Sequence, residues 1–419
     1  MPKMSLDIFK EYYLNNEYDE NMFDDKGNIN PNYNSHKNTG LIATIIEDHL
    51  CDILSDEELK AKIQLLRPNA FEELTKVVKC HNKMLGASAY ECPECHKIIF
   101  ICNTCKSRAC SSCGYKYKEE RVNSILETAY DCSHRHIVFT IPEELRKPFF
   151  LDYSNCISIL FQAVNQTIDS IINETFKRNK KTKKTKRYKN KIHFTPGFFA
   201  FLHTFGRDLK WNPHIHVLIA EKKIANINGN VENLTYFNYD SLSKRFMNIL
   251  LKVLCKYNNN KFLAIKNDLY KTYKNGFYVY AEKKKFHNFK KAIEYVTRYC
   301  GRVPISENRI VNYDGKNVTF SYIDHADNNY YEKTVSAKEF ILLLIRHIPP
   351  KQFKIIRYYG FYRKKPKCHD IIKKIVDESK KSFRKSALKY ENLIVTQFNR
   401  NPFNCPCCNI RCVFVCNLN

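Results

Sequence analysis

The sequence predicts an α+β protein, in which an amino-terminal helical region and a small cysteine-rich module precede a domain of strands and helices. Apolar residues recur at three- and four-residue spacing through residues 45–66 and 71–78, which is typical of amphipathic helices. Two strand-like runs, 197–205 and 213–220, flank a short polar turn and predict an antiparallel hairpin. Three Cys-x2-Cys pairs between residues 92 and 113 predict a compact metal-binding module.

These patterns divide the chain into four expected parts. Residues 1–85 are the helical region, 86–120 the zinc-binding module, 130–365 the α+β domain, and 366–419 a basic tail with a second cysteine cluster. Periodicity predicts strands and helices in mixed order between the module and the tail. Strands are expected at 136–142, 276–282 and 318–324 in addition to the hairpin, and helices at 119–130, 149–176, 240–256, 289–300 and 337–348.

The charge balance indicates a polyanionic partner. Lysine and arginine total 69 against 43 acidic residues, a formal net charge of +26, and an excess of this size attracts nucleic acid. A basic protein of unrelated function is the alternative. Ten of the fifteen residues in 177–191 are basic, which predicts a mobile, solvated loop because like charges repel. Its Lys183, Lys184 and Arg187 are candidate contacts to DNA phosphates, and a loop that does not bind DNA is the alternative.

Neither a membrane nor an export route is expected. No run approaches the roughly 18 apolar residues of a membrane span, and the first residues lack the basic-then-apolar order of a secretory signal. Eighteen cysteines in such a chain favour metal binding over a disulfide framework. The expected location is a reducing prokaryotic cytoplasm, in association with the nucleoid.

The cysteine module predicts zinc. A Cys-x2-Cys turn holds two thiolates on one edge of a tetrahedron, and two such turns complete a structural zinc site. Six thiolates exceed one such site, so either two are spare or a second ion shares ligands. Buried free cysteines are the alternative to zinc. The candidate ligands are Cys92, Cys95, Cys102, Cys105, Cys110 and Cys113.

A second group of cysteines lies near residue 410, at less regular spacing. It is either another zinc site, for which Cys405 and Cys408 are the candidates, or a degenerate zinc ribbon. Structural zinc carries out no reaction, so catalytic groups are expected elsewhere in the chain.

Two further patterns are candidates for catalysis. Alternate side chains of a strand share a face, so His214 and His216 point the same way and form a natural pair of metal ligands. Residues i and i+4 of a helix share a face, so Tyr295 and Tyr299 can point at one place. Incidental strand histidines and helix-packing tyrosines are the alternatives. Together the patterns fit phosphodiester chemistry, because a metal ion can polarise a phosphate while a phenol attacks it and forms a phosphotyrosine.

A catalytic ion needs further ligands from the protein or from water. If the hairpin pairs about its turn, His203 lies opposite His214 and His216 on the same face, and we expect it to be the third ligand. Asp208 in the turn and His136 on the first strand are the fallback candidates. An ordinary sheet histidine is the alternative role for His203.

Several segments resemble the two-tyrosine transposases of the HUH (His-hydrophobe-His) endonuclease superfamily, of the insertion-sequence-ninety-one type. The resemblance runs from about residue 75 to 365. The stretch ECPECHKIIFICNTCKSRACSSCG is similar to their amino-terminal zinc-binding domain, HTFGRDLKWNPHIHVLIAE to their His-hydrophobe-His region, and EYVTRYCGRVPISENRI to their double-tyrosine segment. The tail CPCCNIRCVFVC departs from the family's simpler CPxCG pattern. The zinc ligands that the resemblance implies are Cys92, Cys95, Cys105, Cys110 and Cys113, with Cys102 an addition.

The resemblance implies an HUH-endonuclease-like fold, in which an antiparallel sheet with flanking helices presents the histidines and a helix brings the two tyrosines over them. It implies a metal-dependent transposase that nicks and rejoins single-stranded DNA at transposon ends and in target DNA, through a covalent 5′-phosphotyrosine in rolling-circle-like transposition. The implied cofactors are structural Zn²⁺ and catalytic Mg²⁺ or Mn²⁺. Arg298 and Arg302 are candidate phosphate contacts, because arginine forks suit phosphate oxygens, and solvated helix residues are the alternative.

Two other functions stay open from the sequence. A rolling-circle replication initiator or relaxase would use the same chemistry, and a catalytically inactive zinc-dependent DNA-binding protein would use none. The zinc module ahead of the nuclease favours the transposase, and the intact histidine and tyrosine pairs speak against decay. The sequence leaves open a homo-oligomer, the DNA sequences recognised, and which tyrosine attacks first.

Overall fold

The protein has a mixed α+β structure with antiparallel sheets, as the sequence predicts. The computed structural model describes residues 40–82, 85–107, 109–130, 132–178, 185–189, 192–227, 229–234, 239–281, 304–324, 327–363, 389, 391–392, 395 and 401–418. No helix in these ranges is both long and apolar enough to cross a membrane.

The described residues form two compact units. The first draws on residues within 1–119, 302–348 and 382–419, and the second on residues within 120–301 and 349–381. This division differs from the sequence-based boundaries near residues 86, 130 and 366, because the chain after residue 302 groups with the amino-terminal helices.

Within the helical region expected over residues 1–85, the first unit has helices between residues 41 and 78, and residues 1–39 lie outside the described residues. A meander of three strands and one further helix packs with them: α12 contacts α3, and Lys338 forms an ion pair with Asp56 at 2.9 Å. The same Asp56 side chain accepts the Leu59 N–H at 3.0 Å and so caps the next helix. These elements are α3 (Leu41–Ser55), α4 (Glu57–Leu66), α5 (Ala70–Val78), the 3₁₀ turn η3 (Glu307–Arg309), β10 (Ile310–Tyr313), β11 (Asn317–Ile323), β12 (Tyr330–Ser336) and α12 (Ala337–Ile345).

A separate three-stranded sheet carries the cysteine module. Strands β1 (Ala87–Glu91) and β2 (Ile98–Cys102) form a hairpin, and the tail strand β14 (Val413–Leu418) pairs with the other edge of β1. Helix α6 (Ser111–Thr128) follows the module, and it begins earlier than the helix expected at 119–130.

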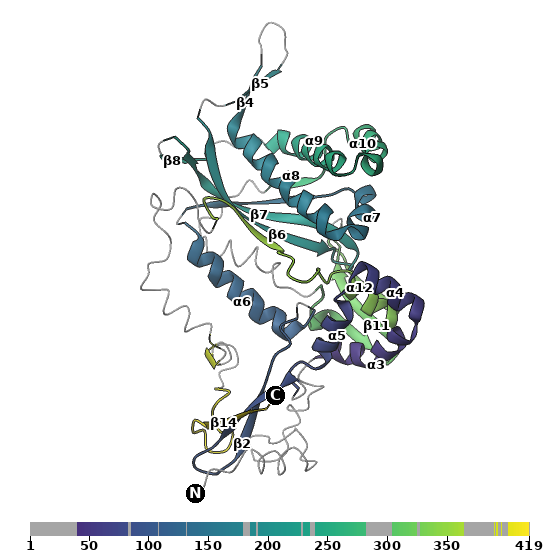
Figure 1. Cartoon of the computed structure of the whole chain (residues 1–419), viewed down its shortest axis with the longest axis vertical. Coiled ribbons are helices and arrows are strands. Elements are labelled where there is room, and N and C mark those ends of the chain that lie inside the picture. Colours follow the sequence, from purple (N-terminus) through teal and green to yellow (C-terminus); the bar gives the residue numbers. More distant parts are fainter. Residues whose placement is uncertain are drawn as a thin grey trace. The chain divides into compact units, whose positions relative to one another are not determined.

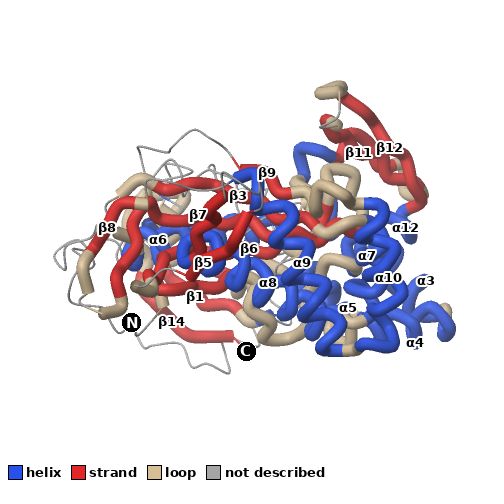
Figure 2. Tube along the Cα trace, turned by 90° about the horizontal axis from the view of Figure 1, so that it is seen from above, coloured by secondary structure: helices blue, strands red, loops and turns tan. Residues whose placement is uncertain are grey.

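The second unit is built on one antiparallel sheet. Its strand order is β13-β6-β7-β3-β9, with β8 paired to β7 (Figures 1 and 2). The predicted hairpin of 197–205 and 213–220 is confirmed and extended on both sides. The strands are β3 (His134–Thr140), β6 (Phe194–Phe205), β7 (Trp211–Ala225), β8 (Val231–Asn233), β9 (Val279–Ala281) and β13 (Ile356–Gly360).

Helices cover one face of this sheet in a layer (Figure 1). Alternate strand residues such as Ile137, Phe139 and Ile215 point into this core and are fully buried, as the two-residue period of a strand requires. The expected helix at 149–176 is two helices that meet at Asp152, and α10 was not predicted. The helices are α7 (Glu143–Leu151), α8 (Tyr153–Asn173), α9 (Tyr239–Tyr257) and α10 (Asn259–Thr272).

The opposite face of the sheet is covered only in part among the described residues. Val122 and Ile125 of α6 pack against Phe199 and Leu218 at one end of that face. Along β7 the residues that share the face of Leu218 are His216 and His214. The histidine pair therefore lies on the same face, beyond the cluster that α6 covers.

The basic stretch 177–191 corrects one expectation. Its flanks form a two-stranded antiparallel ribbon, β4 (Glu174–Arg178) and β5 (Thr185–Lys189), which projects from the end of α8 (Figure 1). The prediction of a loop was wrong for these flanks, because their backbones pair from Glu174 opposite Lys189 to Arg178 opposite Thr185 and so form a strand ladder.

Candidate functional site

Three histidines meet on the face of the sheet opposite the layer of helices. His203 on β6 lies directly opposite His214 on β7, and His216 is two residues further along β7. The ring centroids are 5.3 Å apart for His203 and His214, 4.3 Å for His203 and His216, and 5.0 Å for His214 and His216. One nitrogen from each ring lies within 4.8 Å of the others. This is the geometry of a three-imidazole metal site.

Burial keeps the imidazoles of His214 and His216 neutral, which is the state that binds metal. It lowers the pKa of His214 to about 4, and burial with the neighbouring histidines holds the pKa of His216 well below its usual value. The Nδ1 of His214 lies 2.7 Å from the carbonyl of Asn212. A carbonyl only accepts, so Nδ1 carries the proton and Nε2 keeps its lone pair for a ligand.

A fourth histidine contacts this group without joining it. His136 of β3 places its Nε2 2.9 Å from Nδ1 of His216, and the two rings are nearly parallel. Burial lowers the pKa of His136 to about 4. His136, one of the two fallback ligands, is thus a hydrogen-bonding neighbour of His216 and is not part of the three-histidine group. Asp208 stays in the turn, where it accepts the Lys210 N–H at 3.2 Å, outside the histidine group.

The single tryptophan supports the hairpin. Trp211 is buried, donates its indole N–H to the Arg146 carbonyl at 3.0 Å, and packs edge-on against Phe150. These contacts make it a packing anchor at the start of β7, three residues before His214.

Tyr295, Tyr299, Arg298 and Arg302 fall within residues 282–303, which lie outside the described residues. Lys183 and Lys184 also lie outside the described residues. Arg187 is on β5, where the backbone alone is described. The described chain reaches Ala281 on this side, where β9 pairs with β3 (Figure 2). The Tyr280 ring of β9 lies edge-on to the His136 ring, with the two ring centroids 6.4 Å apart. Strand β9, which residues 282–303 follow in the sequence, thus lies beside His136.

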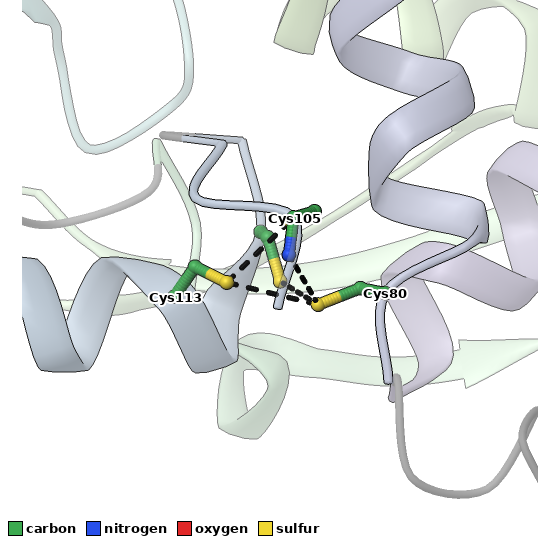
Figure 3. A group of neighbouring side chains, drawn as sticks. Cys80, Cys105 and Cys113 are labelled. Atoms are coloured by element: carbon green, nitrogen blue, oxygen red, sulfur yellow. Dashed lines mark hydrogen bonds between the residues drawn. The ribbon is translucent and has the colours of Figure 1, made fainter. Parts of the chain in front are cut away.

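The first cysteine group contains one ligand candidate that the sequence patterns missed. Cys80, after α5, joins Cys105, Cys110 and Cys113 (Figure 3). The sulfurs lie 3.6 Å apart for Cys80 and Cys113, 3.5 Å for Cys105 and Cys113, and 3.6 Å for Cys80 and Cys110. Sulfurs of a tetrahedral zinc site lie roughly 3.8 Å apart when the Zn–S bonds are about 2.3 Å, so the four thiols fit one ion.

The second group joins the module to the tail. Cys92 and Cys95 meet Cys405 and Cys408, with ligand atoms within 4.8 Å of one another. Five of the six module thiols are thus divided between two groups of four. Cys102 belongs to neither group, because it lies on β2 and packs beside the apolar cluster of the small sheet.

Two family models match the chain. The model described as "Transposase zinc-binding domain" matches residues 46–141, and the one described as "Putative transposase" matches residues 197–369. The first range contains Cys80 and the cysteine module, and the second contains the histidine group and the tyrosine pair. Residues 370–419, with the tail cysteines, lie outside both.

Curated relatives match most of the chain. It is 27% identical over 372 residues to "Transposase for insertion sequence element IS801" of Pseudomonas savastanoi pv. phaseolicola, covering 83% of this chain and 84% of the relative. It is also 27% identical over 372 residues to "Putative transposase y4qJ" of Sinorhizobium fredii (strain NBRC 101917 / NGR234), covering 80% and 86%. No solved structure matches. The zinc-binding match and the cysteine groups together support structural zinc as a cofactor.

Proposed function

Because the chain belongs to the insertion-sequence-ninety-one-type transposases with an amino-terminal zinc-binding domain, we propose that it nicks and rejoins single-stranded DNA at transposon ends and in the target. The phenol oxygen of Tyr295 or Tyr299 attacks a backbone phosphorus. The P–O3′ bond breaks, the tyrosine keeps the 5′-phosphate, and the other strand end leaves as a 3′-hydroxyl. Attack of a 3′-hydroxyl on the phosphotyrosine reverses the step, so rejoining needs no ATP.

The histidine group carries this proposal. His203, His214 and His216 would hold the catalytic divalent ion, because they come from paired strands and offer one ligand nitrogen each within 4.8 Å of the others. His214 and His216 are also neutral, because burial lowers the pKa of each. A bound ion would polarise the scissile phosphate and stabilise the charge that develops on it. Three nitrogen donors suit Mn²⁺ better than Mg²⁺, which prefers oxygen ligands, so Mn²⁺ is the ion to test first.

His136 acts as a positioning residue in this proposal. If His216 binds the ion through Nε2, its Nδ1 carries the proton and donates it to Nε2 of His136, 2.9 Å away. An outer hydrogen bond of this kind fixes the orientation of a ligating imidazole. The carbonyl of Asn212 does the same for His214.

The chain path supports the nucleophile assignment. Residues 282–303 follow directly on β9, whose Tyr280 touches His136. A helix over this segment would present Tyr295 and Tyr299 on one face, with Arg298 and Arg302 available to phosphate oxygens. An antiparallel sheet that presents His-hydrophobe-His beside such a helix corresponds to the HUH-endonuclease fold, which we propose for the second unit.

DNA binding is supported by charge. The net charge of +26 attracts single strands at any sequence. The β4–β5 ribbon projects from the sheet unit (Figure 1), and half of its paired residues are lysine or arginine. A two-stranded ribbon suits contact with a nucleic-acid backbone, so Lys183, Lys184 and Arg187 are proposed phosphate contacts.

The test is formation of a covalent adduct. Purified protein is incubated with Mn²⁺ and labelled single-stranded DNA from its own element ends, and adducts that resist SDS are resolved by electrophoresis. We expect an adduct with the wild type, and its loss in His216→Ala and in the Tyr295→Phe, Tyr299→Phe double variant. His193→Ala is the matched control, since His193 is an exposed histidine of the same unit that contacts Asp169.

Other outcomes separate the alternatives. Tight DNA binding without any adduct would favour the inactive DNA-binding protein. Cleavage confined to a replication-type origin, with no rejoining of element ends, would favour the replication initiator or relaxase. An adduct that survives the double tyrosine substitution would contradict the nucleophile assignment.

A further inference from the structure

The tail of the chain folds onto the cysteine module. Strand β14 pairs with β1 in antiparallel register from Ala87 opposite Leu418 to Glu91 opposite Val413. The Ser88 hydroxyl donates to the Asn417 side chain at 2.9 Å across this pair. Segments more than 300 residues apart therefore share one small sheet, although the matched zinc-binding domain ends at residue 141.

Two turns with the same backbone geometry face each other at the end of this sheet. In the first, the Cys92 N–H donates to the Lys97 carbonyl at 2.8 Å, and the His96 N–H donates back to the Cys92 carbonyl at 3.0 Å. His96 has a φ of 55°, in the left-handed region. This turn directs the Cys92 and Cys95 sulfurs to one side.

The tail repeats this turn feature by feature. The Cys405 N–H donates to the Ile410 carbonyl at 2.8 Å, and the Asn409 N–H donates to the Cys405 carbonyl at 2.9 Å. Asn409 has a φ of 53°. Both turns read Cys-Pro-x-Cys. A left-handed backbone at a residue other than glycine costs free energy, and here it occurs directly after the second cysteine of both turns. The repetition indicates that both turns present their cysteine sulfurs in the same way.

The four sulfurs converge between the turns. Cys95 and Cys405 have their sulfurs 3.6 Å apart, too far for a disulfide bond of about 2.05 Å and close to the roughly 3.8 Å expected around zinc. Cys92 and Cys405 are almost fully buried, and the Tyr90 ring packs against Phe403 beside them. A four-thiolate set in an apolar shell selects zinc over ions that prefer oxygen.

We propose that Cys92, Cys95, Cys405 and Cys408 bind a second structural zinc ion, which clasps the tail to the amino-terminal module. This site is distinct from the one at Cys80, Cys105, Cys110 and Cys113, so each chain holds two zinc ions. The proposal does not depend on the cleavage mechanism, because no catalytic residue takes part.

The ion is needed because the small sheet has little core of its own. Its buried apolar cluster consists of Ala87, Ala89, Ile98, Phe100 and Leu418. Val413 and Phe414 of β14 are more than half exposed. Burial on this scale seldom holds a short strand in place, and metal binding then supplies the folding free energy. Without the second ion, β14 should leave β1.

The experiment measures zinc in the full-length protein by elemental mass spectrometry. We expect two zinc ions per chain in the wild type and one in the Cys405→Ser, Cys408→Ser double variant. The ion that remains shows that the first site is still folded. Limited proteolysis of the double variant should cleave within residues 401–418 at least tenfold faster than in the wild type.

Two further variants make the result specific. Cys407→Ser alters an exposed cysteine inside the same turn, which contacts Lys97, and should keep both ions. Cys408→His replaces one sulfur by an imidazole that zinc also accepts, and should keep both ions as well. Unchanged zinc content in the double variant, or loss of an ion in Cys407→Ser, would overturn the proposal.

Discussion

Removing the hydrogen-bond acceptor at His136 should weaken the catalytic metal site without abolishing it. His136→Phe keeps an aromatic ring in the buried position but leaves the Nδ1–H of His216 without the acceptor that now lies 2.9 Å away. Loss of an outer partner of a ligating histidine typically lowers metal affinity roughly 10- to 100-fold, or about 1.4–2.7 kcal/mol. His136→Gln should restore much of this affinity, because its amide oxygen can accept the same proton.

The affinity can be measured apart from DNA cleavage. Electron paramagnetic resonance of free Mn²⁺ gives the fraction bound by the wild type and by both His136 variants. In nicking assays, the Mn²⁺ concentration for half-maximal rate should rise by the same factor in His136→Phe, while the rate at saturating Mn²⁺ changes much less. Equal Mn²⁺ affinity in all three proteins would refute the reasoning, and so would equally poor binding by the Gln and Phe variants.

Three further predictions concern the folded state. Tyr362→Phe should destabilise the sheet unit by about 1–3 kcal/mol, because the Tyr362 hydroxyl donates at 2.7 Å to the buried Nε2 of His134; urea unfolding followed by Trp211 fluorescence measures this, and an unchanged midpoint would contradict it. Burial lowers the pKa of His134 from 6.5 to about 3, so the neutral form stabilises the fold above pH 6.5 and this contribution falls by about 2 kcal/mol from pH 7.5 to 5; the same urea experiment should show a smaller pH effect in His134→Gln, and an equal effect would count against burial as the cause. Cys80→Ser should lower the zinc content by one ion per chain and Cys102→Ser should not, as judged by elemental mass spectrometry; the reverse pattern would mean that the zinc groups are assigned wrongly.

Local sequence patterns predicted that the three histidines share one face, because the contacts that bring them together are short in sequence. His203 and His214 lie on strands joined by a tight turn, so the register of one hairpin sets their geometry. The role of His136 could not be read the same way. It depends on the pairing of β3 with β7, which places Val138 opposite His216 and His136 two residues along the same strand. Among the described residues, five helices and strands separate β3 from β7 in the sequence, so no local pattern predicts this pairing.

The cysteine groups show where local reading ends. Spacing identified the Cys-x2-Cys turns, but turns of this kind do not specify which pair completes which site. Cys80 lies 25 residues before Cys105, and Cys405, which completes the site with Cys92 and Cys95, lies more than 300 residues after them. One signal was present in the sequence: six module thiols exceed one tetrahedral site and fall short of two, so two separate sites would need thiols from outside the module.

The most direct test of the central claim is to identify the residue that becomes linked to DNA. The wild-type protein is trapped on single-stranded element ends with Mn²⁺, digested with nuclease and trypsin, and the modified peptide is sequenced by mass spectrometry. Cleavage after Arg298 separates the two tyrosines, so the peptide also shows which one attacked. We predict a nucleotide remnant on Tyr295 or Tyr299. A remnant on Tyr280, the exposed tyrosine beside His136, or no covalent adduct under conditions that nick DNA, would contradict the proposed mechanism.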